Sequence, residues 1–115
     1  MSWGNLFLAG DSSHIVPPTG AKGLNLAVSD VHYLSQSLIS FFDENDKNLL
    51  EKYSETALLR VWKGIRFSWW MTTLMQNIPE QNEFERKIQL AELEYLSNSI
   101  GAQKSFAENY VGLPY

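Results

Sequence analysis

The sequence predicts a mainly α-helical fold with one short N-terminal β-strand followed by about four helices. A continuous apolar run at residues 6–9 lies between glycines, as in a strand buried on both faces. From residue 24 onward apolar residues recur at helical spacing, and no further segment has the pattern of a strand. Pro17 and Pro18 separate the two regions, because a proline pair cannot lie inside a helix.

The predicted strand, Leu6–Ala9, has no evident partner in the sequence. A strand that is buried on both faces belongs inside a sheet. We therefore expect its neighbours either in residues that this chain lacks or in a second copy of the chain.

The first helix can begin only after the prolines, near Gly20. Its apolar stripe comprises Leu24, Ala27, Val28, Val31, Leu34, Leu38, Ile39 and Phe42. The polar residues 43–46 interrupt this stripe and offer N-cap candidates for a second helix.

The second helix is predicted to be long and to run through Met75, with Gly64 permitting a bend, until residues 77–79 end it. Its apolar face comprises Leu49, Leu50, Tyr53, Ala57, Leu58, Val61, Trp62, Ile65 and Trp69. A third helix follows, with Phe84, Ile88, Ala91, Tyr95 and Leu96 on one face. Residues 102–109 predict a short final helix, and residues 110–115 a non-helical tail.

Composition narrows the possible functions. The 115 residues form one domain or part of one, and the net charge of −4 argues against a nucleic-acid surface. The chain has no cysteine, and its two histidines show no His-Glu paired spacing, so we expect neither disulfides nor a metal site. The most apolar window, residues 67–75, is too short for a membrane span of about 20 residues. With no secretory signal evident, we expect a cytoplasmic protein.

The segment from residue 10 to 25 holds the candidate ligand-binding residues. Asp11 follows the strand directly, where a carboxylate can accept hydrogen bonds from ligand hydroxyls or, alternatively, from its own turn. Gly20 and Gly23 open a helix whose free N–H groups could bind an anion, with Lys22 adding positive charge. The alternative is an ordinary helix start with glycines for tight packing.

Three other features have simpler interpretations. His14 could be a base, but a lone histidine beside an apolar residue is typical of a packing residue with one satisfied nitrogen. Trp69 and Trp70 predict core or interface. Ser12 follows Gly-Asp as in Gly-Asp-Ser-Leu esterases, but the Asp-x-x-His pair that those enzymes need near the C-terminus is missing.

Three separated blocks of sequence resemble the FAD-dependent aromatic hydroxylases. They are GDSSHIVPPTGAKGLNLA at 10–27, RFSWWMT at 66–72 and ENYVGLPY at 108–115. The similarity covers residues 6–115, and three blocks in the same order are far more specific than Gly-Asp alone.

The resemblance implies a role for each matching residue. Asp11 would bind the ribityl chain of FAD, and the carbonyl of Pro18 would border the substrate, with Thr19 beside it. Tyr110 would belong to the proton relay that deprotonates a phenolic substrate. The residues expected to line the isoalloxazine ring are Gly20, Ala21, Lys22, Gly23, Leu24 and Asn25.

The resemblance also implies the reaction, namely hydroxylation of 4-hydroxybenzoate to 3,4-dihydroxybenzoate with FAD, NADPH or NADH, and O2. Members of the family begin with Gly-x-Gly-x-x-Gly for the ADP half of FAD, which is missing here. We therefore expect residues 1–115 to be a C-terminal portion, with the flavin motif in 1–27 and a helical region in 28–115. Alone it should be inactive and hold FAD weakly. We expect homodimers; the alternative function is a stand-alone helical self-association module.

Overall fold

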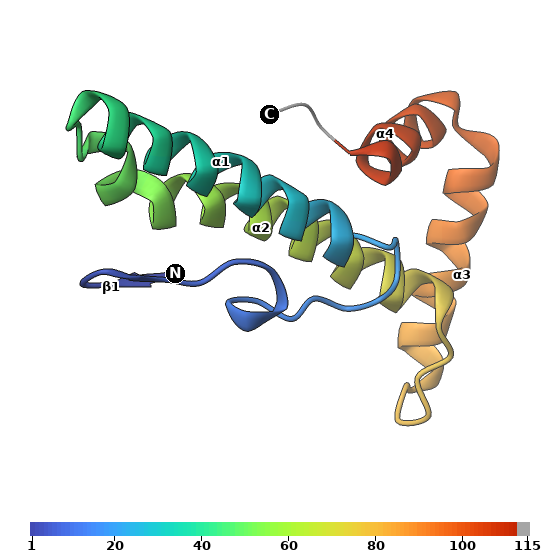
Figure 1. The fold of residues 1–115 in the computed structure, drawn as a ribbon. Helices are drawn as coiled ribbons and strands as arrows, with labels where there is room; N and C mark the ends of the chain where they lie inside the picture. Colours follow the sequence, from blue (N-terminus) through green and yellow to red (C-terminus); the bar gives the residue numbers. More distant parts are fainter. Residues whose placement is uncertain (113–115) are drawn as a thin grey trace.

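The computed structural model describes residues 1–112 and confirms a mainly helical chain with a very small N-terminal sheet. In Figure 1, α1 and α2 form an antiparallel pair, the N-terminal segment runs along them, and α3 and α4 extend from one end. The elements are β1 (Ser2–Trp3), β2 (Leu6–Phe7), the short 3-10 helix η1 (Gly10–Ser12), α1 (Gly23–Glu44), α2 (Asn48–Met75), α3 (Glu83–Asn98) and α4 (Ile100–Val111).

The N-terminal strand is shorter and more exposed than predicted, and its partner lies within the chain. β2 pairs with β1 in an antiparallel hairpin, in which Trp3 faces Leu6. Gly4, with φ +56°, begins the two-residue turn, where a positive φ favours glycine. Leu6 is 59% exposed, so the expectation of a doubly buried strand with partners elsewhere was wrong. The short hairpin turn was the signal that sequence reasoning overlooked.

The first helix begins three residues later than predicted. Gly20 and Ala21 have φ values of +84° and +50°, in the left-handed region, so neither can belong to the helix. The Ala21 N–H donates to the Pro18 carbonyl at 3.0 Å and closes a turn with Gly20 at its third position. A Cβ at Gly20 would lie 2.9 Å from the Phe67 ring. Both the positive φ and this close contact therefore exclude a side chain at Gly20.

The predicted apolar stripe of α1 faces mainly outward rather than into the core. The exposed members, here called the outer stripe, are Leu24, Val28, Val31, Ile39 and Phe42. The buried face of α1 carries Leu26, Ser29, Asp30, Ser37 and Ser40 instead. Ser29 and Ser37 donate to carbonyls of their own helix, which satisfies their hydroxyls and lets this narrow face approach α2.

The apolar core lies along α2, where it packs on α1 and, at Phe67, on the Gly20 turn and α4. Its buried members are Leu26, Tyr53, Ala57, Val61, Phe67 and Leu74. Gly64 admits Leu26, because a Cβ there would lie 3.0 Å from the leucine side chain. Trp62 and Trp69 are exposed, although the sequence placed them on the apolar face of α2. The predicted end of this helix before residues 77–79 is confirmed.

Helices α3 and α4 begin at well-formed caps but bury no residue. Asn82 and Glu85 form a capping box, and the Ser99 side chain accepts from the Ala102 N–H. A single residue, Ser99, separates the two helices, and α4 begins two residues before the predicted residue 102. The tail prediction was wrong for Tyr110 and Val111, which belong to α4; the rest of the predicted tail beyond Gly112 lies outside the described residues.

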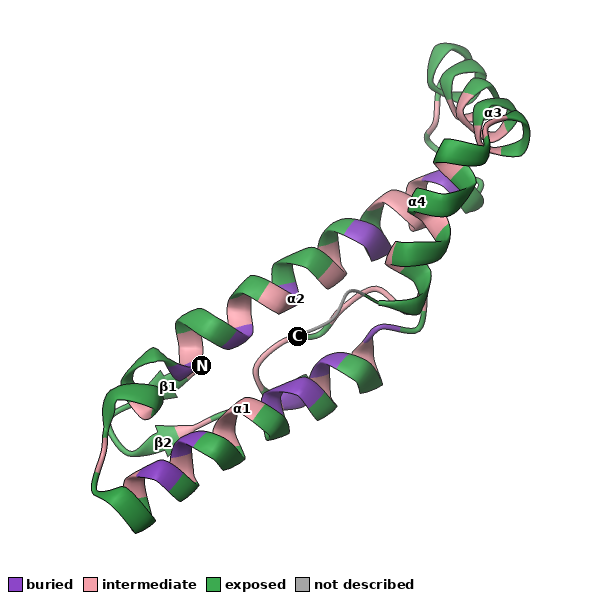
Figure 2. Ribbon diagram, turned by 90° about the horizontal axis from the view of Figure 1, so that it is seen from above, coloured by how far each residue is buried: buried purple, intermediate pink, exposed green. Residues whose placement is uncertain are grey.

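The described chain is too extended for a self-contained domain. Its radius of gyration is 18.1 Å, against roughly 13 Å for a compact domain of this length. Buried positions form a narrow line along α1 and α2 in Figure 2, and α3 and α4 are exposed on most sides. None of the helices in the described part is both long and apolar enough to cross a membrane. The shape indicates that much apolar surface is available for a partner.

Candidate functional site

The Gly10–Asp11 turn holds the first predicted ligand-binding residue at the surface. Gly10 has φ +64°, and a Cβ there would lie 3.2 Å from the Cβ of Ala27. The side chains of Ser12 and Ser13 donate to the carbonyls of Ala9 and Gly10 at 2.8 and 2.9 Å. Asp11 is exposed, and within residues 1–112 no hydrogen bond occupies its carboxylate. The serines therefore supply the local bonds of the turn, and Asp11 is available to a ligand.

Two buried side chains hold this turn from the helices behind it. Asp30 Oδ2 accepts from the Gly10 N–H at 2.8 Å and lies 2.6 Å from His14 Nε2. Tyr53 of α2 donates its hydroxyl to the Leu8 carbonyl at 2.8 Å. Burial, with a smaller contribution from the Asp30 charge, raises the pKa of Tyr53 to about 12. This hydroxyl therefore remains a donor across the physiological pH range.

The N-terminus of α1 is free to receive a ligand. Lys22 stands at the N-cap position but makes no side-chain cap hydrogen bond. The first N–H groups of a helix have no partner inside the helix, and they carry the positive end of its dipole. The residues Gly23, Leu24 and Asn25 thus present N–H groups that suit a carbonyl oxygen or an anion.

The Lys22 side chain points away from this terminus and is buried against α4. Its Nζ donates to the backbone carbonyl of Tyr110 at 2.5 Å and lies 5.0 Å from the centre of the Phe67 ring. Burial, and secondarily the nearby charge of Arg60, lowers the pKa of Lys22. The Lys22 ammonium, which the sequence predicted to add positive charge at the helix start, therefore also binds α4 to the start of α1.

Tyr110 belongs to an aromatic cluster that joins α2 and α4. Its ring stacks on Phe106, with centres 6.0 Å apart and planes inclined by 14°. It also contacts Phe67 edge-on, with ring centres 6.4 Å apart. Trp70 completes the cluster by packing on Phe67 and Phe106. The cluster buries Phe67 but leaves Tyr110 half exposed, so its hydroxyl remains accessible.

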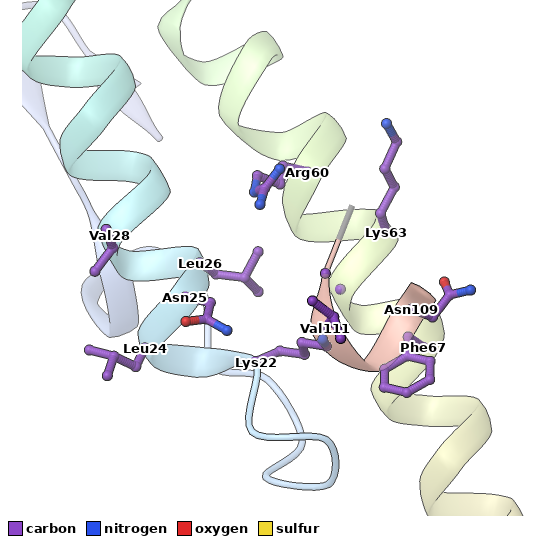
Figure 3. A pocket seen from close by; sticks show the side chains of 12 residues that line it. Lys22, Leu24, Asn25, Leu26, Val28, Arg60, Lys63, Phe67, Asn109 and Val111 are labelled. Carbon is purple, nitrogen blue, oxygen red and sulfur yellow. The ribbon is translucent and has the colours of Figure 1, made fainter. Parts of the chain in front are cut away.

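A pocket of about 310 Å³ lies where α1, α2 and α4 meet, and Figure 3 shows side chains from all three helices around it. Of the predicted flavin-contacting residues, Lys22, Leu24 and Asn25 line this pocket, with Asn109 and Val111 from α4. Gly20 and Ala21 form the turn just before the helix, beside the half-buried Thr19. Asp11 and Pro18 do not line the pocket.

Sequence reasoning missed three residues that organise the site. The sequence indicated no role for Asp30, Tyr53 was assigned only to the apolar face of the second helix, and Phe67 only to an apolar window. A buried-face aspartate on α1 was the available signal, because such a carboxylate needs polar partners. The interpretation of His14 as a packing residue with one satisfied nitrogen is confirmed, since its Nδ1 has no partner among the described residues.

Comparison with known proteins agrees with these features. Residues 1–68 match the family described as FAD binding domain. The chain is 56% identical over 115 residues to p-hydroxybenzoate hydroxylase of Acinetobacter baylyi, which is 100% of this chain and 28% of the relative. Over 38 residues it is 50% identical to rifampicin monooxygenase of Streptomyces venezuelae, covering 33% of this chain and 8% of that enzyme. A 4-methyl-5-nitrocatechol 5-monooxygenase from Burkholderia is 48% identical over 40 residues, 35% of this chain and 7% of the relative.

Proposed function

Because this chain belongs to the FAD binding domain family and is homologous over its whole length to p-hydroxybenzoate hydroxylase, we propose that it forms the ribityl- and isoalloxazine-binding part of an FAD-dependent aromatic hydroxylase. The chain spans 28% of that relative's length. The remaining flavin contacts are proposed to come from other residues of a parent protein. One arrangement carries this proposal. The free carboxylate of Asp11 lies on a turn that is bonded to α1, and the N-terminus of α1 has no side-chain cap.

The residues present suit FAD. A ribityl chain offers hydroxyl donors, and Asp11 offers an exposed acceptor without a competing hydrogen bond in the described chain. The N–H groups at the start of α1 would stabilise negative charge on the N1–O2 edge of a reduced isoalloxazine ring. Gly23 has no side chain and so lets the ring approach the backbone closely, whereas the space beside Gly20 is filled by the Phe67 ring.

Each remaining site residue has a distinct proposed duty. Thr19 and the backbone from Gly20 to Asn25 would line the flavin ring. The Pro18 carbonyl, which already accepts the Ala21 N–H, retains a second lone pair for the substrate side. Lys22 would add positive charge behind the helix start while it secures α4.

The proposed substrate is a phenolic acid such as 4-hydroxybenzoate, which would become 3,4-dihydroxybenzoate. FAD, reduced by NADPH or NADH, supplies the oxygen-activating chemistry when it is bound. Tyr110 would relay the substrate's phenolic proton, accepting it at its hydroxyl oxygen while its own proton passes on towards solvent, because a phenolate is the more reactive ring towards an electrophilic oxygen. The need for these nucleotides favours the cytoplasm. This chain alone, with half a flavin site, is proposed to be inactive.

Replacing Asp11 with alanine in the parent flavoprotein should weaken FAD binding by about tenfold to a hundredfold, because hydrogen bonds to charged groups contribute roughly 1.5–3 kcal/mol. Titration of the apoprotein with FAD, followed by flavin fluorescence, measures this change. Asp43→Ala removes an exposed carboxylate far along α1 and should leave the affinity unchanged. Equal affinity of the Asp11→Ala variant and the parent would contradict the proposed flavin site.

A second candidate function is self-association through the outer stripe of α1. This stripe is apolar along the whole helix, and Leu24 and Phe42 near its ends are 76% and 75% exposed. Apolar surface of this extent marks an interaction site. The N-terminal strand is a weaker candidate, because β2 is already paired on one edge by β1.

The isolated chain should therefore form dimers at micromolar concentration, and Val31→Asp should shift it to monomers, because a charge would be buried at the centre of the contact. Sedimentation velocity across a concentration series measures this equilibrium. Gln36→Asp adds the same charge at an exposed position outside the stripe and serves as the matched control. A wild-type chain that stays monomeric at high concentration would rule out this function.

A further inference from the structure

Asp30 connects the flavin-binding turn to the inner face of α1. Its carboxylate is fully buried, although it lies 20 residues along the chain from Gly10. One oxygen, Oδ2, takes both contacts: the Gly10 N–H at 2.8 Å and His14 Nε2 at 2.6 Å. These two anchor points lie on either side of Asp11, one directly before it and the other three residues after it.

The turn between the anchor points is closed on itself. The N–H groups of Ser13 and His14 both donate to the Gly10 carbonyl, at 2.9 and 3.1 Å. Gly10 is therefore bonded through its carbonyl to the turn and through its N–H to Asp30. The turn is thereby fastened as one unit to Asp30, and its exposed residues are Asp11 and Ser12.

The Asp30–His14 pair is a poor way to stabilise a fold. Among the described residues, Asp30 Oδ1 and His14 Nδ1 are buried without a hydrogen-bond partner. A buried carboxylate with one oxygen unsatisfied costs free energy, and well-packed apolar residues in the same space are often as stable or more so. The role of the Asp30–His14 pair therefore lies in the position that it imposes on the turn from Gly10 to His14.

We propose that Asp30 and His14 form a buried clamp that positions Asp11 for the flavin. This inference rests on the proposed function of Asp11 and makes Asp30 and His14 positioning residues, since both act through the turn. The clamp ties the ribityl-binding carboxylate to α1, the helix whose N-terminus faces the isoalloxazine ring in the proposed site. A single helix, α1, thereby fixes the ribityl-binding and ring-binding halves of the proposed site relative to each other.

The test compares two replacements of His14 in the parent flavoprotein. His14→Leu removes the donor to Asp30 at similar volume and should raise the FAD dissociation constant about tenfold. His14→Gln retains an N–H donor and should bind FAD within about threefold of the parent. Ser37→Ala, which removes another buried polar group from the same face of α1, controls for a general loss of stability and should leave FAD affinity unchanged.

The clamp is distinguished from a structural role by repeating the test without Asp11. In an Asp11→Ala background, His14→Leu should change FAD affinity by less than about threefold, because the residue that the clamp positions is gone. Equal FAD affinity of the His14→Leu and His14→Gln variants would overturn the clamp. So would an undiminished tenfold loss in the Asp11→Ala background. If Asp11→Ala alone leaves the FAD affinity unchanged, the result contradicts the proposed flavin site itself, and the clamp falls with it.

Discussion

Replacing Phe67 with alanine is expected to lower the free energy of unfolding by about 3–5 kcal/mol, the usual range for truncating a buried phenylalanine. Phe67 is 2% exposed and stands where the Gly20 turn, the Lys22 side chain and the aromatic rings of α4 meet. The truncation leaves a cavity and also removes the ring over which the Lys22 ammonium lies. Urea unfolding followed by circular dichroism measures the loss.

Phe84 provides the matched control for this experiment. It is also a phenylalanine in a helix, but it is 70% exposed at the start of α3. Phe84→Ala should change the unfolding free energy by no more than about 0.5 kcal/mol. If Phe67→Ala costs less than about 1 kcal/mol, Phe67 is not the centre of the packing between the turn, α2 and α4.

Tyr110→Phe should slow hydroxylation by the parent flavoprotein about 10²- to 10⁴-fold, the usual contribution of a positioned general acid or base. The substitution preserves the ring that stacks on Phe106 and the backbone carbonyl that accepts from Lys22, so the fold should persist. Only the hydroxyl is lost. Single-turnover measurement of product formation, beside a titration with FAD, separates slower chemistry from weaker cofactor binding.

Tyr95→Phe is the corresponding control, because Tyr95 is an exposed tyrosine on α3 that has no proposed role in the reaction. This variant should turn over at the parent rate. The proton-relay role of Tyr110 predicts slow hydroxylation with unchanged FAD affinity. A Tyr110→Phe enzyme with normal turnover would remove Tyr110 from the proposed reaction.

The number and order of helices could be predicted from the sequence because their boundaries depend on local chemistry. Pro17 and Pro18 exclude a helix whatever the tertiary contacts, and residues 77–79 end α2 for a similar local reason. The boundary at Ser99 is local as well, since this one residue ends α3 and caps the start of α4. The segment from Gly10 to Asn25 was found in the same way, through glycines, prolines and an acid at close spacing.

Only the tertiary structure decided which surfaces are covered. A helical stripe shows that one face of α1 is apolar, but its spacing does not say what lies against that face. In the structure the outer stripe is exposed, and small serines beside Leu26 let α1 approach α2 closely instead. Extended helices that pack on partners elsewhere are not distinguished by periodicity from helices that pack on one another.

The same distinction applies to the candidate site. Asp11 is recognisable from its neighbours in the sequence, because a turn and its exposed acid are local features. The bonds from Asp30 to Gly10 and from Lys22 to Tyr110 span 20 and 88 residues. Such contacts depend on how the helices pack, so no local pattern encodes them. The sequence by itself determined which residues form the proposed flavin motif, and the packing of α1, α2 and α4 decided how they are held.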